Sequence, residues 1–246
     1  MPTGSCSFVI PAPPQASLPV RGAGLPPGAR FPVRRIYCVG RNFADHAREM
    51  GAAAPASPDE RGAPVFFLKP ADALVPEGGD VPYPPGTSDL HHEVELVVAL
   101  GRDAPAGLLA PAAAETLVLG YGIGLDLTRR DLQAAAKAKG LPWDTGKSFD
   151  HAAPASALRP AAELGDLAPR TLSLRVNGEL RQQATLDRMI WTVPEILHEL
   201  SKLYALRAGD LVFMGTPAGV GPLLPGDTFT AALDDDIALH GWIEAA

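Results

Sequence analysis

The stretch His92-Glu-Val-Glu-Leu-Val-Val-Ala-Leu100 decides the fold class of this chain and carries its first chemical signal. Its apolar run predicts a buried β-strand, in which successive side chains point to opposite faces. Glu93 and Glu95 would therefore share one face, while His92 points away from them. Two carboxylates on one buried face repel each other unless a cation or protons compensate their charge. The stretch thus predicts half of a metal site.

A third acid follows in the run Gly122-Ile-Gly-Leu-Asp-Leu-Thr-Arg-Arg-Asp131. Its Asp126 could meet Glu93 and Glu95 at one cation. Oxygen ligands alone favour Mg²⁺ or Mn²⁺, with Ca²⁺ as a third candidate, and three carboxylates leave positions for water or a chelating substrate. The alternative is a solvated strand with alternating acids, which two glutamates alone do not exclude.

Length and composition describe an ordinary globular chain. It has 246 residues, of which 46% are hydrophobic and 20% charged, enough for a substantial core. Its net charge of −7 makes a nucleic acid or an anionic membrane an unfavourable partner. Cys6 and Cys38 lack the spacing of a zinc finger or a disulfide framework. No signal-peptide pattern and no apolar run of about 20 residues is found, so we expect a cytoplasmic protein without a membrane span.

The first third of the chain contains an arm and a candidate catalytic pair. Residues 1–32 carry eight prolines, which predicts an extended arm, without packed helix or sheet, lying across the body or a partner subunit. A strand is expected at 36–40, followed by a short helix with Asn42 as cap and Gly51 as stop. On this helix His46 and Glu49 share a face, although such a pair is often merely solvated. Residues 52–63 are expected to form a mobile loop that a site could use as a lid.

The remaining elements predict a β-rich α+β fold with a few short helices. We expect strands at 65–69 and 211–214, helices at 128–139 and 193–205, and a hairpin from residue 171 with Asn177-Gly178 as a type I′ turn. The helix at 128–139 would start with a capping box of Thr128 and Asp131. One of its sides would carry Arg130, Gln133 and Lys137.

A glycine-rich loop, Gly215-Thr-Pro-Ala-Gly-Val-Gly221, follows the strand at 211–214. It lacks the lysine of a P-loop and the spacing of a dinucleotide fingerprint. We expect its backbone to contact a small oxyanion or carboxylate, with a hydroxyl from Thr216.

Six stretches, in this order, resemble the fumarylacetoacetate hydrolase family. They are Tyr37-Cys-Val-Gly-Arg-Asn-Phe-Ala-Asp-His-Ala-Arg-Glu49, Phe67-Leu-Lys-Pro70, His92-Glu-Val-Glu95, Gly124-Leu-Asp126 with Thr128-Arg-Arg-Asp131, Lys147-Ser-Phe-Asp150, and the glycine-rich loop. They span residues 35 to 221. Phe8-Val-Ile-Pro11 and the run Phe31-Pro-Val-Arg-Arg-Ile-Tyr-Cys-Val-Gly-Arg-Asn42 look most like the bacterial fumarylpyruvate hydrolases of this family.

The resemblance implies a mixed β-sandwich roll, a homodimer, and one catalytic domain over residues 35–246 preceded by an arm over residues 1–34. It implies Mg²⁺ or Mn²⁺ on Glu93, Glu95 and Asp126. It further implies a catalytic pair, His46 and Glu49, and a substrate-supporting Lys147. Phe43 stands where many members carry tyrosine, a departure that affects no catalytic role.

These residue types suit hydrolysis of the carbon–carbon bond of an acylpyruvate. The resemblance implies that this acylpyruvate is fumarylpyruvate, cleaved to fumarate and pyruvate in the degradation of aromatic acids through gentisate. His46, oriented by Glu49, would take a proton from water. The hydroxide would attack the distal keto carbon, and Lys147 or Lys69 would stabilise the oxyanion. Candidates for binding the carboxylates of a dicarboxylate keto acid are Arg41, Arg130 and Gln133.

Two alternatives stay open. The first is another reaction on the same metal site, either decarboxylation of oxaloacetate or isomerisation and decarboxylation of a hydroxyhepta-dienedioate, which needs no hydrolytic water. The second is a catalytically idle, metal-binding paralogue, which the intact His46 and Glu49 pair argues against. No motif fixes the acyl group that the site accepts.

Overall fold

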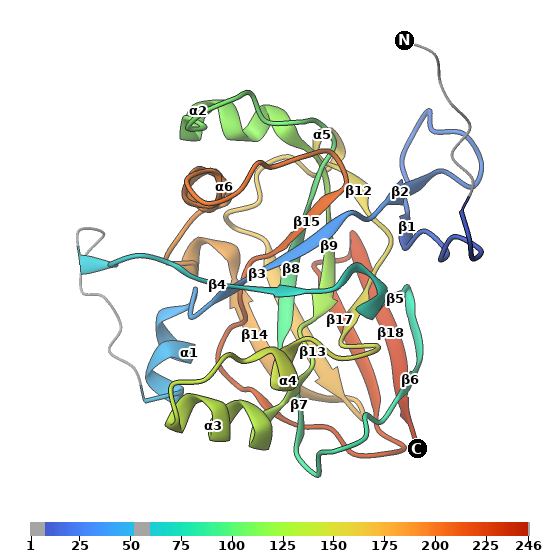
Figure 1. The fold of residues 1–246 in the computed structure, drawn as a ribbon, viewed down its shortest axis with the longest axis vertical. Coiled ribbons are helices and arrows are strands. Elements are labelled where there is room, and N and C mark those ends of the chain that lie inside the picture. Colours follow the sequence, from blue (N-terminus) through green and yellow to red (C-terminus); the bar gives the residue numbers. More distant parts are fainter. Residues whose placement is uncertain (1–7, 52–59, 246) are drawn as a thin grey trace.

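A computed structural model describes residues 8–51 and 60–245 of the chain. An eight-stranded mixed sheet runs through the centre of the molecule (Figure 1). In spatial order it consists of β4 (Val65–Lys69), β3 (Arg35–Gly40), β15 (Asp210–Phe213), β8 (Val94–Leu100), β9 (Val118–Leu125), β11 (Ala153–Ala155) and β5 (Leu74–Pro76), with β12 (Arg159–Pro160) also paired to β9.

Strand β8 occupies the middle of this sheet and is buried at each of its seven residues. It pairs antiparallel with β15 on one side and β9 on the other. Both faces of the sheet are covered here, which is why the sequence is a continuous apolar run. The predicted strands at β3, β4, β8 and β15 are confirmed.

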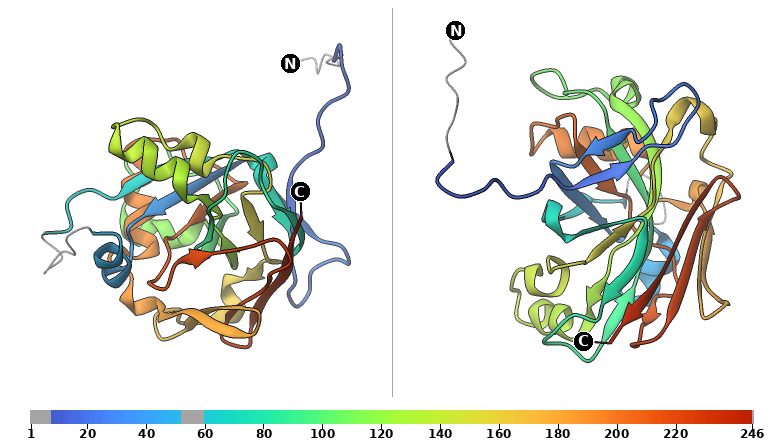
Figure 2. Two further views of the ribbon diagram at one scale, coloured as in Figure 1. Left: turned by 90° about the horizontal axis from the view of Figure 1, so that it is seen from below. Right: turned by 90° about the vertical axis from the view of Figure 1, so that its right-hand side faces the viewer.

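A five-stranded sheet packs against one face of the central sheet, over β8 and β9. Figure 2 shows two of its strands, β17 (Thr228–Leu233) and β18 (Ile237–Glu244), in red, as a layer beside the central strands. The turn between β13 (Thr171–Val176) and β14 (Glu179–Thr185) has φ angles of 52° at Asn177 and 81° at Gly178. The predicted type I′ hairpin is therefore confirmed. In spatial order its strands are β14 (Glu179–Thr185), β13 (Thr171–Val176), β17 (Thr228–Leu233), β18 (Ile237–Glu244) and β6 (Gly78–Pro82).

Alternate residues of β8 belong to two different cores. Leu96 and Val98 pack in the main core between the two sheets, whereas Val97 and Ala99 pack in a smaller core on the opposite face. Glu93 and Glu95 precede Val97 and Ala99 in this alternation. The two acids therefore share a face, as predicted, and the polar site continues directly into the smaller core.

The arm contributes to that smaller core. A short antiparallel pair, β1 (Ser17–Pro19) with β2 (Arg30–Pro32), buries Leu18 and Phe31 there. The prediction of an arm without sheet is wrong for these residues, because two well-placed apolar side chains suffice to hold strands whose prolines lie at their ends. Residues 8–15 are exposed and extend away from the body (Figure 2).

The helices are short, and the longest in the described part of the chain have nine residues. Helices α2 and α6 lie together at one end of the molecule, and α3, α4 and α1 surround the opposite end (Figure 1). This strand-rich mixture with few helices confirms the predicted fold class. The helices are α1 (Ala44–Glu49), α2 (Pro111–Ala114), α3 (Arg130–Ala138), α4 (Asp144–Lys147), α5 (Ala161–Leu164) and α6 (Val193–Ser201), with single 3₁₀ turns at Ala71–Ala73, Glu115–Leu117 and Leu186–Arg188.

Two predicted helix starts are wrong. Asn42 does not cap α1, because its side chain instead donates to the carbonyls of Trp191 and Met214 and accepts from the Trp191 N–H. Thr128 does not form a capping box, because it lies in β10 (Thr128–Arg129) and α3 begins only at Arg130. In both cases long-range contacts outcompete a local cap.

Other expectations differ less from the structure. Helix α6 ends at Ser201, short of the expected residue 205. The expected lid at 52–63 falls mostly on residues 52–59, which lie outside the described residues. No helix of the described ranges has both the length and the apolarity to cross a membrane. Strand β10 joins β7 (Leu90–His92) and β16 (Gly221–Pro222) in a small sheet beside the site.

Candidate active site

Three carboxylates meet where the first residues of β8 lie beside the end of β9, at one end of these two central strands. Glu93 lies between β7 and β8, Glu95 on β8, and Asp126 directly after β9, whose Leu125 pairs with Val94. The Asp126 N–H donates to the carbonyl of Glu93 over 2.8 Å and continues the ladder. One oxygen of each acid lies within 4.8 Å of the others. The backbone pairing thus brings the predicted triad together across thirty residues of intervening chain.

Buried cations flank two of these acids. The Lys147 ammonium lies 2.7 Å from Glu93 Oε2 and 2.6 Å from Asp126 Oδ2, and Arg130 also pairs with Glu93. Burial alone would raise the pKa of Glu93, but Lys147 and Arg130 hold it well below its usual range. Burial would lower the pKa of Lys147, yet Asp126 and Glu93 raise it above its ordinary value. Glu93 and Lys147 are therefore both charged.

Glu95 has a different environment. Burial, reinforced by Asp126 and Glu93, raises the pKa of Glu95 well above its ordinary value. No described cation forms an ion pair with it, and its bond from the Gly215 N–H measures 2.7 Å. Its carboxylate is thus the least compensated of the three, which leaves it available to a further cation.

The donor set fits a hard divalent metal. Asp126 Oδ1 is buried without a hydrogen-bond partner in the described structure, although it lies 2.8 Å from the Lys69 ammonium. Together with Glu95 it offers oxygen atoms that the protein leaves incompletely satisfied. Three carboxylates within reach of one another are the ligands that Mg²⁺ and Mn²⁺ prefer. The chain therefore carries an acidic triad able to bind such a metal.

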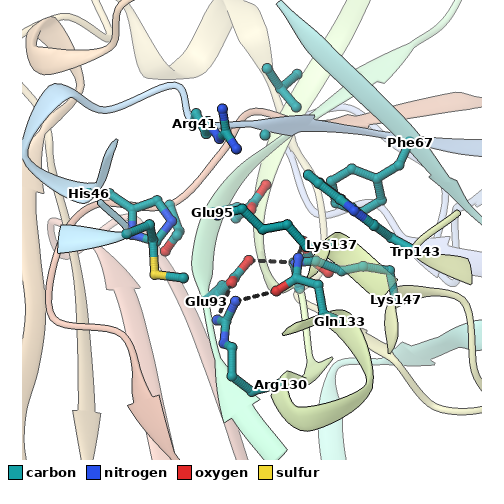
Figure 3. Close-up of a pocket in the computed structure, with 15 residues that line it drawn as sticks. Arg41, His46, Phe67, Glu93, Glu95, Arg130, Gln133, Lys137, Trp143 and Lys147 are labelled. Atoms are coloured by element: carbon teal, nitrogen blue, oxygen red, sulfur yellow. Dashed lines mark hydrogen bonds and ion pairs between the residues drawn. The ribbon is translucent and has the colours of Figure 1, made fainter. Parts of the chain in front are cut away.

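The histidine and glutamate of α1 form the expected pair. His46 Nδ1 lies 3.1 Å from Glu49 Oε2, and the other oxygen of Glu49 accepts from the Gly219 N–H over 3.0 Å. With Nδ1 engaged by the carboxylate, Nε2 of a neutral imidazole is the atom left to accept a proton. His46 lines the same pocket as the triad, opposite the side formed by Phe67, Trp143 and Lys147 (Figure 3).

Helix α3 and the β3–α1 connection supply the remaining polar wall. Gln133 Oε1 accepts from Arg130 over 2.6 Å, and both side chains line the pocket. Arg41 and Lys137 also line it, and neither forms an ion pair with a described residue. Two uncompensated cations at one pocket suit an anionic ligand.

Lys69 and the glycine-rich loop have roles that the sequence did not suggest. Lys69 does not line the pocket: it is buried beneath it, where it pairs with Asp126 and donates to the carbonyls of Leu127 and Lys147. The glycine-rich loop does bind carboxylates through its backbone, but these belong to Glu95 and Glu49 of the protein itself. Thr216 lines the pocket as expected.

Sequence reasoning did not single out Trp143, Met50 or Gln182. The first two line the pocket, and Gln182 lies behind it in hydrogen-bond contact with Thr216. Met50 had a signal, since it follows His46 by four residues and so lies on the same helix side. Trp143 and Gln182 had none, because each comes from a segment that only the fold brings to the triad. Lys137 had a signal, since it shares a helix side with Arg130 and Gln133.

An acidic triad able to bind a divalent metal and a histidine–glutamate pair line one pocket of a strand-rich fold, an arrangement suited to a metal-dependent enzyme. Residues 35–240 match the family described as fumarylacetoacetate (FAA) hydrolase C-terminal. The chain belongs to this family.

Individual relatives carry two kinds of name. The oxaloacetate tautomerase FAHD1 of Homo sapiens, a mitochondrial protein, is 44% identical over 86% of this chain and 92% of its own. The mitochondrial oxaloacetate decarboxylase of Dictyostelium discoideum is 38% identical over 81% and 88%. The crystal structure of fumarylpyruvate hydrolase from Pseudomonas aeruginosa with Mn²⁺ and pyruvate is 41% identical, covers 98% of this chain and 100% of its own, and superposes with a TM-score of 0.87. The predicted family fold is thereby confirmed.

Proposed function

We propose that this protein is a metal-dependent acylpyruvate hydrolase that cleaves fumarylpyruvate to fumarate and pyruvate. The observation that carries the proposal is the His46–Glu49 pair in the same pocket as the acidic triad. The extent of similarity supports it. Among the solved structures, the fumarylpyruvate hydrolase covers 98% of this chain with a TM-score of 0.87, whereas the 2-hydroxyhepta-2,4-diene-1,7-dioate isomerase of Mycobacterium marinum covers 89% with a TM-score of 0.72.

The site residues divide the work. Glu93, Glu95 and Asp126 would hold Mg²⁺ or Mn²⁺, which when bound supplies Lewis-acid polarisation of a keto acid. Lys147 would keep two of these carboxylates in place and present an ammonium group to the pocket. His46, with its Nδ1 hydrogen donated to Glu49, would accept a proton from water at Nε2.

The bond changes follow from these placements. The hydroxide forms a bond to the distal keto carbon of the acylpyruvate, and the carbon–carbon bond to the adjacent methylene breaks. The electron pair of that bond passes to the methylene, which takes up the proton from His46 to give pyruvate. The acyl part leaves as a carboxylic acid, which releases its proton to solvent and becomes the carboxylate, fumarate for fumarylpyruvate.

Substrate recognition would rely on the polar wall. Arg41 and Lys137 have no ion pair with the described residues and would bind the distal carboxylate of a dicarboxylate substrate. Gln133 keeps its amide N–H groups for the substrate, because its oxygen accepts from Arg130. Thr216 would donate its hydroxyl to a substrate anion.

A second candidate is enol–keto tautomerisation or decarboxylation of oxaloacetate. Identities of 44% and 38% to proteins with these names favour it. Such reactions need the metal-binding triad but no water-activating pair. The dienedioate isomerase has weaker support, because the solved structure with that name is 30% identical to this chain. No feature of the described residues favours the idle paralogue.

The assay that separates the candidates uses the purified protein with Mn²⁺, Mg²⁺ or EDTA. We expect metal-dependent loss of the ultraviolet absorbance of fumarylpyruvate, with fumarate and pyruvate formed in equal amounts. Oxaloacetate is tested in parallel for ketonisation and for pyruvate formation. Turnover of oxaloacetate with intact fumarylpyruvate would reject the hydrolase and support the second candidate.

The cytoplasmic location and the homodimer stay predictions. Several relatives are named as mitochondrial, and the family resemblance is what suggests the dimer. Light scattering on the purified protein tests the oligomeric state, with twice the monomer mass of 25.7 kDa as the expected result.

A further inference from the structure

Strand β14 is an edge strand whose residues from Glu179 to Gln183 are exposed with one exception, Gln182. This side chain is 1% exposed, and all its polar atoms are engaged. Its oxygen accepts from His92 Nδ1 over 2.9 Å and from the Val94 N–H over 3.1 Å. Its nitrogen donates to Thr216 Oγ1 over 2.7 Å and to the Pro217 carbonyl over 2.8 Å.

These partners fix the orientation of the amide. The Val94 N–H can only donate and the Pro217 carbonyl can only accept, so the oxygen of Gln182 must face Val94 and its nitrogen must face Pro217. Thr216 therefore accepts from Gln182. The hydroxyl hydrogen of Thr216 remains free to donate elsewhere, and Thr216 lines the pocket.

The Gln182 amide contacts two segments that both belong to the site. His92 and Val94 flank Glu93 in sequence. Thr216 and Pro217 lie between Gly215, which donates to Glu95, and Gly219, which donates to Glu49. A single buried amide thus joins the segment that carries two of the triad acids, Glu93 and Glu95, to the loop that holds Glu95 and the partner of His46.

We propose that Gln182 is a positioning residue that acts through the glycine-rich loop. It holds the loop against the β7–β8 junction and turns the Thr216 hydroxyl hydrogen toward the anionic ligand in the pocket. The kinetic part of this inference rests on the proposed function, whereas the binding part does not. A buried amide with a merely structural role would affect stability but not ligand affinity.

Gln182→Glu is the informative variant, because it changes one atom and keeps the oxygen that faces His92 and Val94. Its second oxygen would accept from Thr216, whose hydroxyl hydrogen would then turn away from the pocket, and the Pro217 carbonyl would lose its donor. Oxalate, a small dianion that is not turned over, serves as the probe for binding to the Mn²⁺-loaded protein. Calorimetry measures the Kd of oxalate and, separately, the Kd of Mn²⁺.

We expect Gln182→Glu to weaken oxalate binding at least about tenfold, as for loss of one hydrogen bond to a charged group. The Kd of Mn²⁺ should stay within about threefold, because the variant keeps the oxygen that contacts His92 and Val94 on either side of Glu93. Gln183→Glu, on the exposed face of the same strand, is the matched control and should change neither constant.

Thr216→Val provides the second test. Because Gln182 acts through Thr216, the double variant with Gln182→Glu should bind oxalate no more weakly than Thr216→Val alone. Wild-type oxalate affinity in folded Gln182→Glu, or multiplicative losses in the double variant, would overturn the proposal. Gln182→Met keeps the test decisive if the glutamate variant does not fold, since it also removes the donor to Thr216. Absence of fumarylpyruvate turnover in the wild type would reject the proposed function without affecting these binding results.

Discussion

At the scale of single residues, Lys147 compensates much of the buried negative charge of the site. Its ammonium is almost fully buried and touches two carboxylates that we assign to the metal. Lysine and metal therefore share the task of compensating the same buried negative charge. If the lysine is removed, the metal alone compensates this charge, and if the metal is removed, the lysine does.

We expect Lys147→Met to lose about 3–5 kcal/mol of unfolding free energy in EDTA, because Glu93 and Asp126 then remain buried without their common cation. Mn²⁺ should restore more stability to this variant than to the wild type. Urea unfolding with EDTA or Mn²⁺ measures both effects. Lys202→Met, which removes an exposed pair with Glu199, is the control and should cost less than about 1 kcal/mol. Equal stabilisation of wild type and variant by Mn²⁺ would contradict the shared role.

His46 tests the proposed hydrolysis directly. His46→Ala should lower kcat for fumarylpyruvate by at least about 100-fold, the usual contribution of a positioned general base. The affinity for Mn²⁺ should be unchanged, because the proposed metal ligands are Glu93, Glu95 and Asp126 and not His46. His240→Ala, at an exposed histidine of β18, is the control. Retained hydrolysis in His46→Ala would remove the proposed base.

Lys137 tests the proposed substrate class. Lys137→Met should raise KM for fumarylpyruvate about tenfold, as expected for loss of one charged contact. It should leave KM for acetylpyruvate unchanged, because that substrate has no distal carboxylate. Lys139→Met, two residues further along and outside the pocket, is the matched control. Equal effects on both substrates would assign Lys137 to another part of the ligand.

At the scale of elements, the glycine-rich loop depends on close backbone approach. Gly215 has φ of 88°, and a Cβ atom there would lie 2.7 Å from the Cβ of Asn42 and 3.0 Å from the Val39 carbonyl. Asn42 in turn ties α1 to this loop and to Trp191. The loop, β3 and α1 therefore pack as one unit that holds His46 beside the triad.

Gly215→Ala should lower the unfolding free energy by about 2–4 kcal/mol, through a left-handed backbone and an overpacked contact. Gly226→Ala separates the two causes, because Gly226 has φ of 91° but no heavy atom within 4 Å of its added Cβ. That control should cost only about 1 kcal/mol. Urea unfolding of both variants provides the comparison, and equal losses would show that close packing at Gly215 is unimportant.

Element-scale prediction succeeded where the signal was local. The Asn177-Gly178 hairpin and the apolar β8 follow from turn chemistry and from burial on both faces, which neighbouring residues encode. It failed at Asn42 and Thr128, where the residue type suggested a cap. Asn42 instead bonds to Trp191 and Met214, and Thr128 pairs through its backbone with His91 of β7. Single-sequence reasoning has no access to such distant partners.

At the scale of the whole molecule, the arm divides into two parts with different roles. Residues 8–15 are exposed, whereas Leu18 and Phe31 complete the smaller core beneath the site. The division of the chain at residue 34 stays a prediction. The thermal stability of truncated chains can nevertheless show which residues of the arm stabilise the fold.

Deletion of residues 1–14 should leave Tm unchanged within about 2 °C, since it removes exposed side chains in the part the structure describes. Deletion of residues 1–33 should lower Tm by about 10 °C or more, because burial of two large apolar side chains contributes about 2–3 kcal/mol each. Thermal unfolding of both truncations measures the difference. A stable second truncation would show that the smaller core forms without the arm.

The sequence by itself determined the strand β8, the shared face of Glu93 and Glu95, the pairing of His46 with Glu49, and the family. These depend on periodicity, helix spacing and ordered motifs, which are properties of neighbouring residues. Only the tertiary structure decided that Lys69 lies beneath the pocket, that the glycine-rich loop binds Glu95 and Glu49, and that Gln182 joins the loop to the triad segment. Those contacts join strands far apart in sequence, so their partners are fixed by sheet pairing and packing rather than by local residue order.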